Sequence, residues 1–219
     1  MKLSSEALLI EAAQVVLSHS ADKPDVEQVV SALLACEKAT RQRKQTYDFH
    51  QLQGRWRLCF ITGTRKARNR AGIVLGAGRY LPRWVEIQIA YSVNSNLNKT
   101  DSVDALRFTN DTRQERDSEI LVGRVENAVK LAGIQFSLQG PTQFWDSKNI
   151  LAFDFTRLTL EIFGQQLYQG GIRGGVAQEQ KFYQSSLREQ AFFTYFWVSQ
   201  QAIAARGRGG GLALWGRLS

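Results

Sequence analysis

The residue best placed to do covalent chemistry is Cys59, which follows Arg55 and Arg57 in the segment 54–60. Neighbouring cations favour the thiolate form of a cysteine, and the thiolate is the nucleophile. Cys59 could therefore act as the attaching thiol of a bilin-lyase-like protein that handles a chromophore. The segment alternates, however, so that Cys59 shares a face with the two arginines, opposite the apolar residues. We therefore name no catalytic residue and keep a lyase-like activity as an alternative to a non-enzymatic function.

Two further patterns resemble enzyme sites but fail in detail. Asp154 and Glu161 could form a carboxylate pair for acid–base catalysis, yet strand alternation separates them from the apolar inward positions. Gly76 and Gly78 follow a short apolar run, as at the start of a dinucleotide-binding fingerprint. The third glycine position of that fingerprint is Leu81, followed by a proline, which argues against the helix that such a site needs. No cofactor is expected.

The histidines and cysteines do not suggest a metal site. The chain has His19 and His50, and its two cysteines, Cys36 and Cys59, lie in segments of different character. Their spacing matches neither a zinc site nor a redox pair, and it suits a reducing compartment. With 219 residues, 43% of them hydrophobic, the chain is expected to form one packed domain. No apolar run approaches the ~20 residues of a membrane-spanning helix.

The net charge of +8 is concentrated in one part of the sequence. Residues 41–83 contain eleven lysines and arginines and a single acid, whereas residues 84–126 carry more acidic than basic residues. Such a segment either forms a solvated set of loops or attracts an anionic surface, such as lipid headgroups or nucleic acid. The basic residues assigned to contact with an anionic membrane surface are Arg65, Lys66, Arg68 and Arg70. The Arg-Gly-Arg-Gly-Gly element at 206–210 leads into an alternating strand, which argues against nucleic acid as a partner.

The hydrophobic period divides the chain into an N-terminal helical pair, residues 1–50, and a region of short strands, residues 51–219. Ser4 is expected to cap the first helix, and Pro24 with Asp25 to begin the second. Both helices should pack on the strands, with Cys36 in the contact. Strands are predicted at 54–60, 84–91, 103–108, 120–129, 133–138, 150–156, 158–163, 192–199, 202–206 and 212–215. Residues 178–190 fit either a helix or an extended chain.

The succession of short strands predicts a mainly β fold, a lipocalin-like antiparallel β-barrel preceded by the helical pair. Pairing of the first strand with the last removes the exposed edges. Phe192 and Phe196 alternate with Phe193, Tyr195 and Trp197, so both faces of that strand are aromatic. Something must therefore cover the outer face: the helices, a loop or another protein. The inner face either fills the barrel or lines a cavity for one small ligand.

We predict an elongated apolar ligand, because the inward rows contain almost no polar group that could bind a charged substrate. The residues expected to line the site are Trp56, Leu58, Phe60, Asn127, Phe136, Phe153, Phe155 and Tyr195. Asn127 and Tyr195 would meet any polar end of the ligand at the mouth of the barrel. The alternatives are a barrel filled by these side chains and a protein-interaction module whose outer aromatic face binds another protein.

Three short motifs follow one another along the chain. The first is a Leu-x-Gly-x-Trp-x-Leu strand, the second a Gly-x-x-x-Asn strand, and the third a Thr-Tyr pair followed by Arg-Gly-x-x-Gly and an apolar strand. Their residues are Leu52, Gly54, Trp56 and Leu58, then Gly123 and Asn127, then Thr194, Tyr195, Arg206, Gly207 and Gly210. In this combination, over residues 51–215, the chain resembles the plastid-lipid-associated proteins, the fibrillins of plants and cyanobacteria.

This resemblance implies a lipocalin-like protein that carries or shelters a quinone, carotenoid or acyl lipid at photosynthetic membranes without catalysis. It implies a peripheral position on the cytoplasmic side of the thylakoid membrane in a cyanobacterium, or in a plastid if a transit peptide has been removed. Met1 leads straight into a helix, which favours the cyanobacterial case. In lipocalin-like folds an arginine of the last strands covers the inward tryptophan of the first, so the resemblance assigns barrel closure to Trp56 and Arg206.

Overall fold

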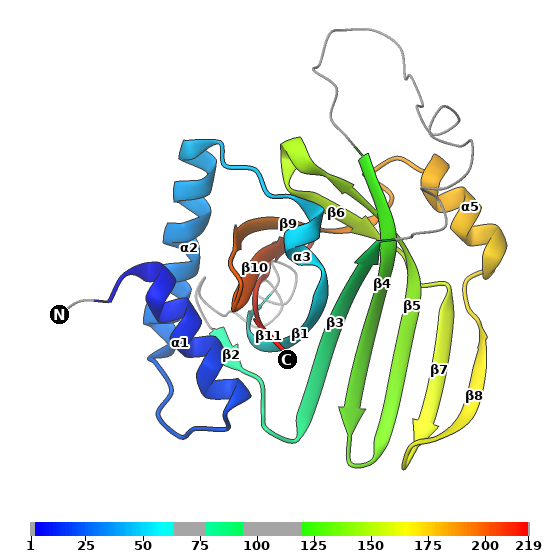
Figure 1. The fold of residues 1–219 in the computed structure, drawn as a ribbon, viewed down its shortest axis with the longest axis horizontal. Helices are drawn as coiled ribbons and strands as arrows, with labels where there is room; N and C mark the ends of the chain where they lie inside the picture. The colour runs from blue at the N-terminus through cyan, green and yellow to red at the C-terminus, as the bar shows by residue number, and fades with distance from the viewer. Residues whose placement is uncertain (1–2, 64–77, 94–119, 219) are drawn as a thin grey trace, which may run out of the picture.

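A closed barrel of eight antiparallel strands forms the centre of the molecule (Figure 1). The structure is a computed structural model that describes residues 3–63, 78–93 and 120–218. Around the barrel the strands follow in the order β1 (Gly54–Thr62), β3 (Val85–Val93), β4 (Ile120–Leu131), β5 (Ile134–Trp145), β6 (Ile150–Phe153), β9 (Ala191–Val198), β10 (Ala202–Gly207) and β11 (Leu212–Arg217). β11 pairs with β1, which closes the barrel. The predicted fold class is therefore confirmed, together with the pairing of the first strand with the last.

Three further strands, and the two helical segments that follow β5 in the chain, lie outside the closed ring. They are β2 (Gly78–Tyr80), β7 (Arg157–Ile162), β8 (Gln165–Gly171), the single turn of 3-10 helix at Asp146–Lys148, and α5 (Val176–Gln184). Sequence reasoning missed β8, because its glutamines and glycines do not alternate with apolar residues. The ambiguous segment 178–190 begins as helix α5 and continues without regular structure to β9. The strand predicted at 103–108 lies outside the described residues.

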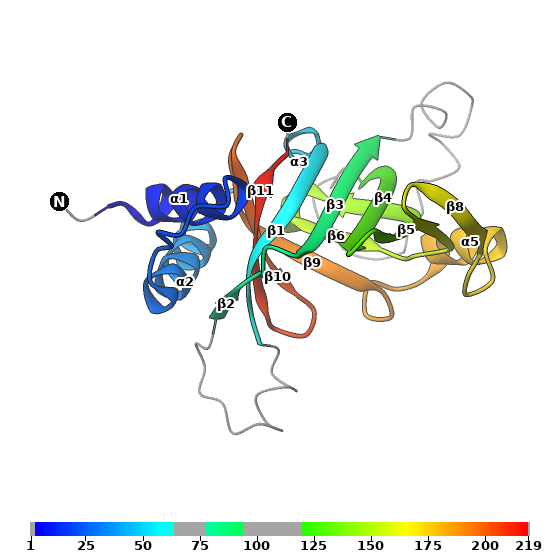
Figure 2. The same cartoon turned by 90° about the horizontal axis from the view of Figure 1, so that it is seen from below.

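Two helices cover one side of the barrel (Figure 2). They are α1 (Ser5–Leu17) and α2 (Val26–Arg43). Ser4 caps α1 as predicted, because its Oγ accepts a hydrogen bond from the amide of Ala7 at 3.2 Å. Asp25 caps α2 through its carboxylate, so Pro24 lies before the helix and not in its first turn. Cys36 is buried in the contact between the helices and the strands, as expected.

Two β-bulges place neighbouring residues on the same side of the barrel wall. The register of β1 against β11 shifts between Leu58 and Phe60, so Phe60 packs outward into the helical contact. The predicted role of Phe60 in an inner ligand site is therefore wrong, because its ring lies 5.1 Å from that of Tyr80, outside the barrel. A second shift, in the β9–β10 pair, lets Phe196 and Trp197 both face the helices.

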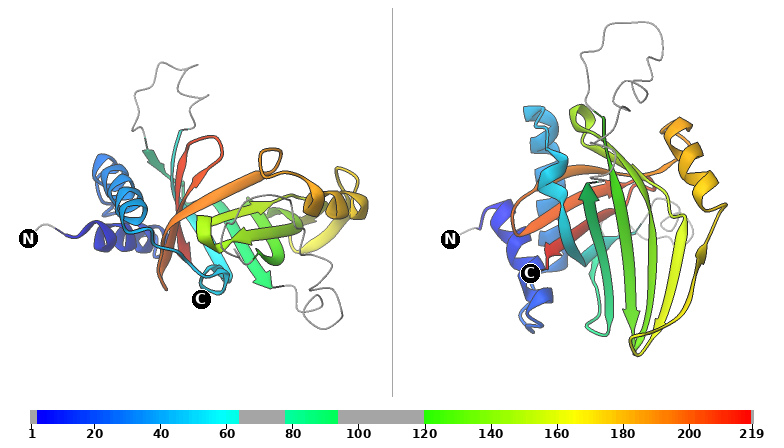
Figure 3. Two further views of the ribbon diagram at one scale, coloured as in Figure 1. Left: turned by 90° about the horizontal axis from the view of Figure 1, so that it is seen from above. Right: turned by 45° about the vertical axis from the view of Figure 1, so that its right-hand side comes forward.

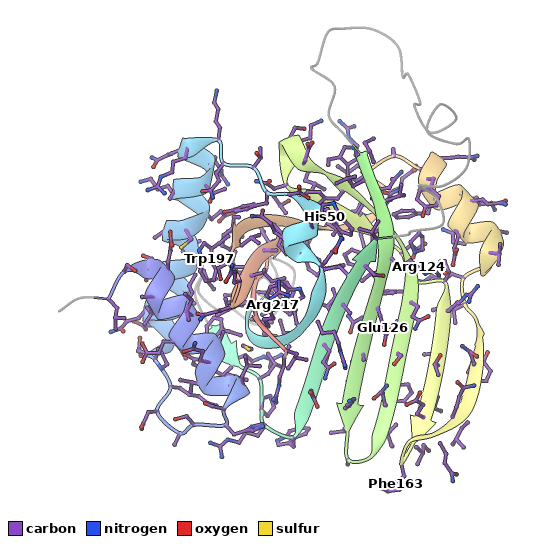
Figure 4. The ribbon with its side chains drawn as sticks, in the orientation of Figure 1. His50, Arg124, Glu126, Phe163, Trp197 and Arg217 are labelled. Atoms are coloured by element: carbon purple, nitrogen blue, oxygen red, sulfur yellow. The ribbon has the colours of Figure 1, made fainter. Side chains whose placement is uncertain are left out.

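The helices therefore cover two of the outward aromatic side chains of β9. Phe196 and Trp197 are both buried in this way, and Trp197 is drawn beside α2 in Figure 4. Phe196 and Trp197 are therefore not free to bind another protein, because the chain's own helices cover them.

Strand β5 has two different partners on one side. Its second half pairs with β6 and its first half with β7, and the two partners are separated by the break at residues 154–156. Gly140 faces this break, where a side chain would meet the carbonyl of Asp154. Beyond the break β6 continues to β9 and closes the barrel, whereas β7 continues only to β8. The strands β3, β4, β5, β7 and β8 therefore extend past one end of the closed barrel (Figure 3).

Candidate apolar binding site

One end of the barrel is capped by the short helix α3 (Phe49–Leu52). Phe49 and Leu52 are fully buried and belong to the inner hydrophobic cluster. The indole N–H of Trp56 donates to the carbonyl oxygen of Leu52 at 2.8 Å, which ties the cap to the first strand. The guanidinium of Arg217 lies over the Trp56 ring, 4.1 Å from its centroid. Figure 4 shows Arg217 below α3, the helix that carries the labelled His50.

The assignment of barrel closure to Arg206 is therefore wrong. Arg206 has the same orientation along β10 as Ala202 and Ala204, which pack on the helices. Its guanidinium binds both carboxylate oxygens of Glu37 on α2, at 2.6 and 2.5 Å. This hydrogen bond raises the pKa of Arg206.

Arg217 performs the closure in place of Arg206, because it pairs directly with Trp56 in the β1–β11 register. The pairing depends on the strand register, so no sequence signal distinguished Arg217 from Arg206.

The inner wall of the barrel carries a connected row of aromatic rings. Successive ring centroids lie 5.1 to 6.4 Å apart along Tyr91, Tyr195, Trp215, Phe193, Phe153 and Phe155. At the capped end the hydroxyls of Tyr91 and Tyr195 lie 2.7 Å apart, and burial raises the pKa of both. At the other end the rings of Phe155 and Phe193 are only half-buried. The row therefore becomes accessible toward the break beside β7.

The predicted ligand residues lie at different depths inside the barrel. Trp56 and Tyr195 lie deep in the inner cluster and have almost no exposed surface. The predicted place of Tyr195 at the mouth of the barrel is therefore wrong, because its hydroxyl is buried against that of Tyr91. Phe153 belongs to the same cluster, and Leu58 and Phe155 pack against it from half-buried positions. The structure thus brings these five predicted residues together inside the barrel.

Beyond the closed barrel the inward face of the extension is apolar and incompletely covered. Cross-strand pairing aligns its side chains in rows, for example Ile87 with Val129, Phe136, Leu160 and Tyr168. We call this set the inner apolar face: Val85, Ile87, Val129, Leu131, Ile134, Phe136, Leu138, Leu158, Leu160, Ile162 and Tyr168. Phe136 keeps 45% of its surface exposed, so this predicted ligand residue lies on the extension and not in the packed interior.

Two polar atoms lie among these apolar side chains. Asn127 pairs with Ile89 and Leu138, which places it between the packed interior and the inner apolar face. Its Oδ1 is buried and has no hydrogen-bond partner within the described part of the chain. The same is true of the Oγ1 of Thr142, on the same face of β5 as the buried ring of Phe144. Unpaired buried polar atoms destabilise a fold, so a hydrogen bond from a group outside the described residues would stabilise either position.

Helix α5 holds the break in place. Glu179 accepts hydrogen bonds from Thr156 at 2.8 Å and from Arg124 at 3.3 Å. Asp154, at the break itself, accepts from Arg173 and Gln178 at 3.0 and 3.1 Å. These contacts fix the backbone on both sides of Phe155 and so fix the half-buried end of the aromatic row.

Cys59 has the wrong environment for a nucleophile. It is fully buried beneath α1, with its Sγ 3.6 Å from the carbonyl oxygen of Ala13 and 3.3 Å from that of Arg57. Burial raises the pKa of the thiol to about 12, and the smaller effect of Arg57 does not reverse this. The expectation that neighbouring arginines produce a thiolate is therefore wrong, and Cys59 is a neutral core residue at physiological pH.

Several other sequence predictions concern surfaces outside this site. The basic residues Arg65, Lys66, Arg68 and Arg70 lie outside the described residues. Among residues 3–63, 78–93 and 120–218, no group of three or more potential ligand side chains could hold a metal ion. In the same ranges no helix is long and apolar enough to cross a membrane. No protein-family model, curated protein or solved structure matches this chain.

Proposed function

We propose that this protein binds one elongated apolar molecule, such as a quinone, a carotenoid or an acyl lipid, without changing it chemically. The ligand would lie along the inner apolar face and reach the half-buried end of the aromatic row. The observation that carries the proposal is the exposure of Phe136 and its neighbours on the inward side of a barrel wall. A β-barrel is compatible with lipid binding, and the resemblance to plastid-lipid-associated proteins favours a quinone or carotenoid at photosynthetic membranes.

Hydrophobic burial supplies the driving force for this binding. Full burial of a leucine-sized or phenylalanine-sized side chain contributes ~1.5–3 kcal/mol, and the residues of the inner apolar face are covered only in part. A ligand that covers several of them gains a fraction of that value at each side chain. The gain must exceed the entropy lost when the ligand is held, so a long molecule that contacts several rows is favoured over a small one.

The polar groups of the site select a neutral ligand. The buried residues of the inner cluster carry no charge, and the guanidinium of Arg217 at the capped end lies over the ring of Trp56. The Oδ1 of Asn127 has no partner and can accept a hydrogen bond from a ligand hydroxyl, and the Thr142 hydroxyl can donate one to a ligand carbonyl. Quinones and oxygenated carotenoids carry such groups at their ends.

Binding is tested by titration of the purified protein with a short-chain plastoquinone analogue, a carotenoid and a fatty acid, followed by tryptophan fluorescence. Trp215 belongs to the aromatic row, so a bound quinone should quench its emission. The variant Phe136→Gln removes an exposed ring from the inner apolar face and should weaken binding by ~10-fold or more. Leu167→Gln is the matched control, because Leu167 is 60% exposed on β8 and does not belong to the inner apolar face.

Mass spectrometry of lipids that co-purify from the native host identifies the ligand. Failure of all three ligand classes to bind folded protein would overturn the proposal. Equal loss of binding in the Phe136 and Leu167 variants would also contradict it, since it would show that the inner face has no special role.

A further inference from the structure

Exposed apolar side chains gather at the turns that end the extension. The turn before β3 carries Trp84, which is 68% exposed, and the turn between β7 and β8 carries Phe163, which is 83% exposed. Between them, the β4–β5 turn is flanked by the exposed side chains of Leu131 and Ile134. Figure 4 shows Phe163 at the lower margin of the sheet, away from the helices and the capped end. We call these four residues the turn edge.

Phe163 occupies a position that disfavours its residue type. Its φ is +48°, followed by Gly164 at +78°, so both residues of this two-residue turn are left-handed. Asparagine and glycine are the usual residues there, and a bulky side chain is unfavourable. The ring gains little in return, because most of it is exposed to solvent. Neither the backbone conformation nor burial within the chain accounts for a phenylalanine at this position. Its exposed ring therefore indicates contact with another molecule.

The two neighbouring turns are held together at this edge. The amide of Phe163 donates to the carbonyl oxygen of Gly133 at 2.7 Å. A Cβ atom on Gly133 would lie 2.6 Å from the Phe163 ring, and Gly133 itself has φ +83°. The exposed ring is therefore fixed in position and not free at the end of a loop.

The charges beside the turn edge are balanced. A shallow hollow of about 350 Å³ lies between the turns. Its charged lining residues are Arg83, Lys130, Glu86 and Glu161, two cations and two carboxylates. Lys130 pairs across the strands with Glu86, and Glu161 pairs with Gln135. Charges of both signs beside one another are complementary to a zwitterionic headgroup, which carries a phosphate and an ammonium group.

We propose that the turn edge docks on a phospholipid surface, with Trp84 and Phe163 inserted among the headgroups. This inference rests on the proposed function, since a water-insoluble ligand needs an apolar path out of the bilayer. The geometry provides that path, because the row of the inner apolar face nearest to the turns is Val85, Leu131, Ile134 and Ile162. Tryptophan and phenylalanine favour the membrane interface, and burial of their rings drives the contact.

The test measures partitioning of the full chain onto phosphatidylcholine vesicles by sedimentation, at low and high salt. Wild type should bind in both conditions, because apolar insertion is not screened by salt. Trp84→Ser and Phe163→Asn should each lower partitioning ~10-fold, the equivalent of ~1.4 kcal/mol. Phe163→Asn should fold at least as stably as wild type, since asparagine tolerates the left-handed turn. Leu34→Gln, an exposed site on α2, is the control and should bind like wild type.

Fluorescence provides a second readout. Trp84 is the most exposed tryptophan among those described, so its emission should shift to shorter wavelength on vesicles, and the shift should vanish in Trp84→Phe. Equal partitioning of wild type and both edge variants, or no binding of wild type, would overturn the inference. Titration with the short-chain quinone in solution separates the two proposals. Quinone binding without vesicle binding contradicts only the docking edge, whereas vesicle binding without ligand binding contradicts the proposed function.

Discussion

Arg217 and Trp56 lie directly opposite each other in the pair formed by the last and first strands, with the guanidinium 4.1 Å from the indole centroid. Gly54 makes this possible, because a Cβ atom there would lie 2.7 Å from the Arg217 Nη1 and its φ is +113°. The Gly-x-Trp spacing of the first motif therefore has a physical origin. Glycine admits the arginine, and the tryptophan two residues later receives it.

Loss of this contact should destabilise the barrel. Arg217→Ala removes the stacking interaction, worth ~0.5–2 kcal/mol, together with hydrogen bonds to the carbonyls of Gln200 and Gln53. We expect the free energy of unfolding in urea to fall by ~1–3 kcal/mol. Arg157→Ala, an exposed arginine on β7, is the control and should change it by less than ~0.5 kcal/mol. An equal change in the free energy of unfolding for both variants would show that the stacking of Arg217 on Trp56 does not contribute to stability.

High pH should lower the free energy of unfolding, because the Cys59 thiol is buried. Folding raises the pKa of the Cys59 thiol from 9.0 to about 12. Between these two pH values the thiol keeps its proton in the folded protein and loses it in the unfolded chain. This contribution to stability is complete below pH ~9 and is lost as pH rises toward 12, by at most ~1.4 kcal/mol per pH unit.

Thiol labelling checks the same burial directly. Cys59 and Cys36, whose pKa is raised to about 11, should resist alkylation at pH 8 until urea unfolds the protein. Rapid labelling of Cys59 in the native state would revive the lyase-like alternative.

Thr142 offers a test of the ligand's polar end. Thr142→Val keeps the shape of a fully buried side chain and removes an Oγ1 that has no partner in the described structure. The variant should therefore unfold with a free energy raised by up to ~1 kcal/mol. If the hydroxyl meets the ligand, affinity for a quinone should fall while affinity for an unsubstituted hydrocarbon stays constant. A parallel decrease for both ligands would instead indicate altered packing.

The basic segment predicts a second mode of membrane contact. Neutralising Arg65, Lys66, Arg68 and Arg70 together should weaken binding to anionic vesicles at low salt, by up to ~1 kcal/mol for each residue that reaches the surface. This contact should disappear at high salt, unlike insertion of the turn edge. Cosedimentation with phosphatidylglycerol vesicles distinguishes the two, and unchanged binding of the neutralised variant would exclude the segment.

Alternation of residue types was sufficient to predict most strands and the closure of the barrel, because one-sided burial imposes a period of two. It failed at Phe60, since a bulge inserts one residue and reverses the faces after it, and no local signal marks the position. It also missed β8, whose polar residues pair with β7 at the edge of the extension. The partner of Trp56 could not be chosen between Arg206 and Arg217 without the strand register, which only the folded chain defines.

Because β5 pairs with both β6 and β7, the length of the extension sets the length of the apolar surface offered to a ligand. Residues 134–139 pair with β7 and lie beyond the closed ring, a length of ~20 Å at ~3.3 Å per residue. Two residues added to each strand of the β4–β5 and β7–β8 hairpins would lengthen the apolar surface by ~7 Å without changing any face inside the barrel. Chain length of the preferred ligand can therefore change independently of the barrel, through the hairpins alone.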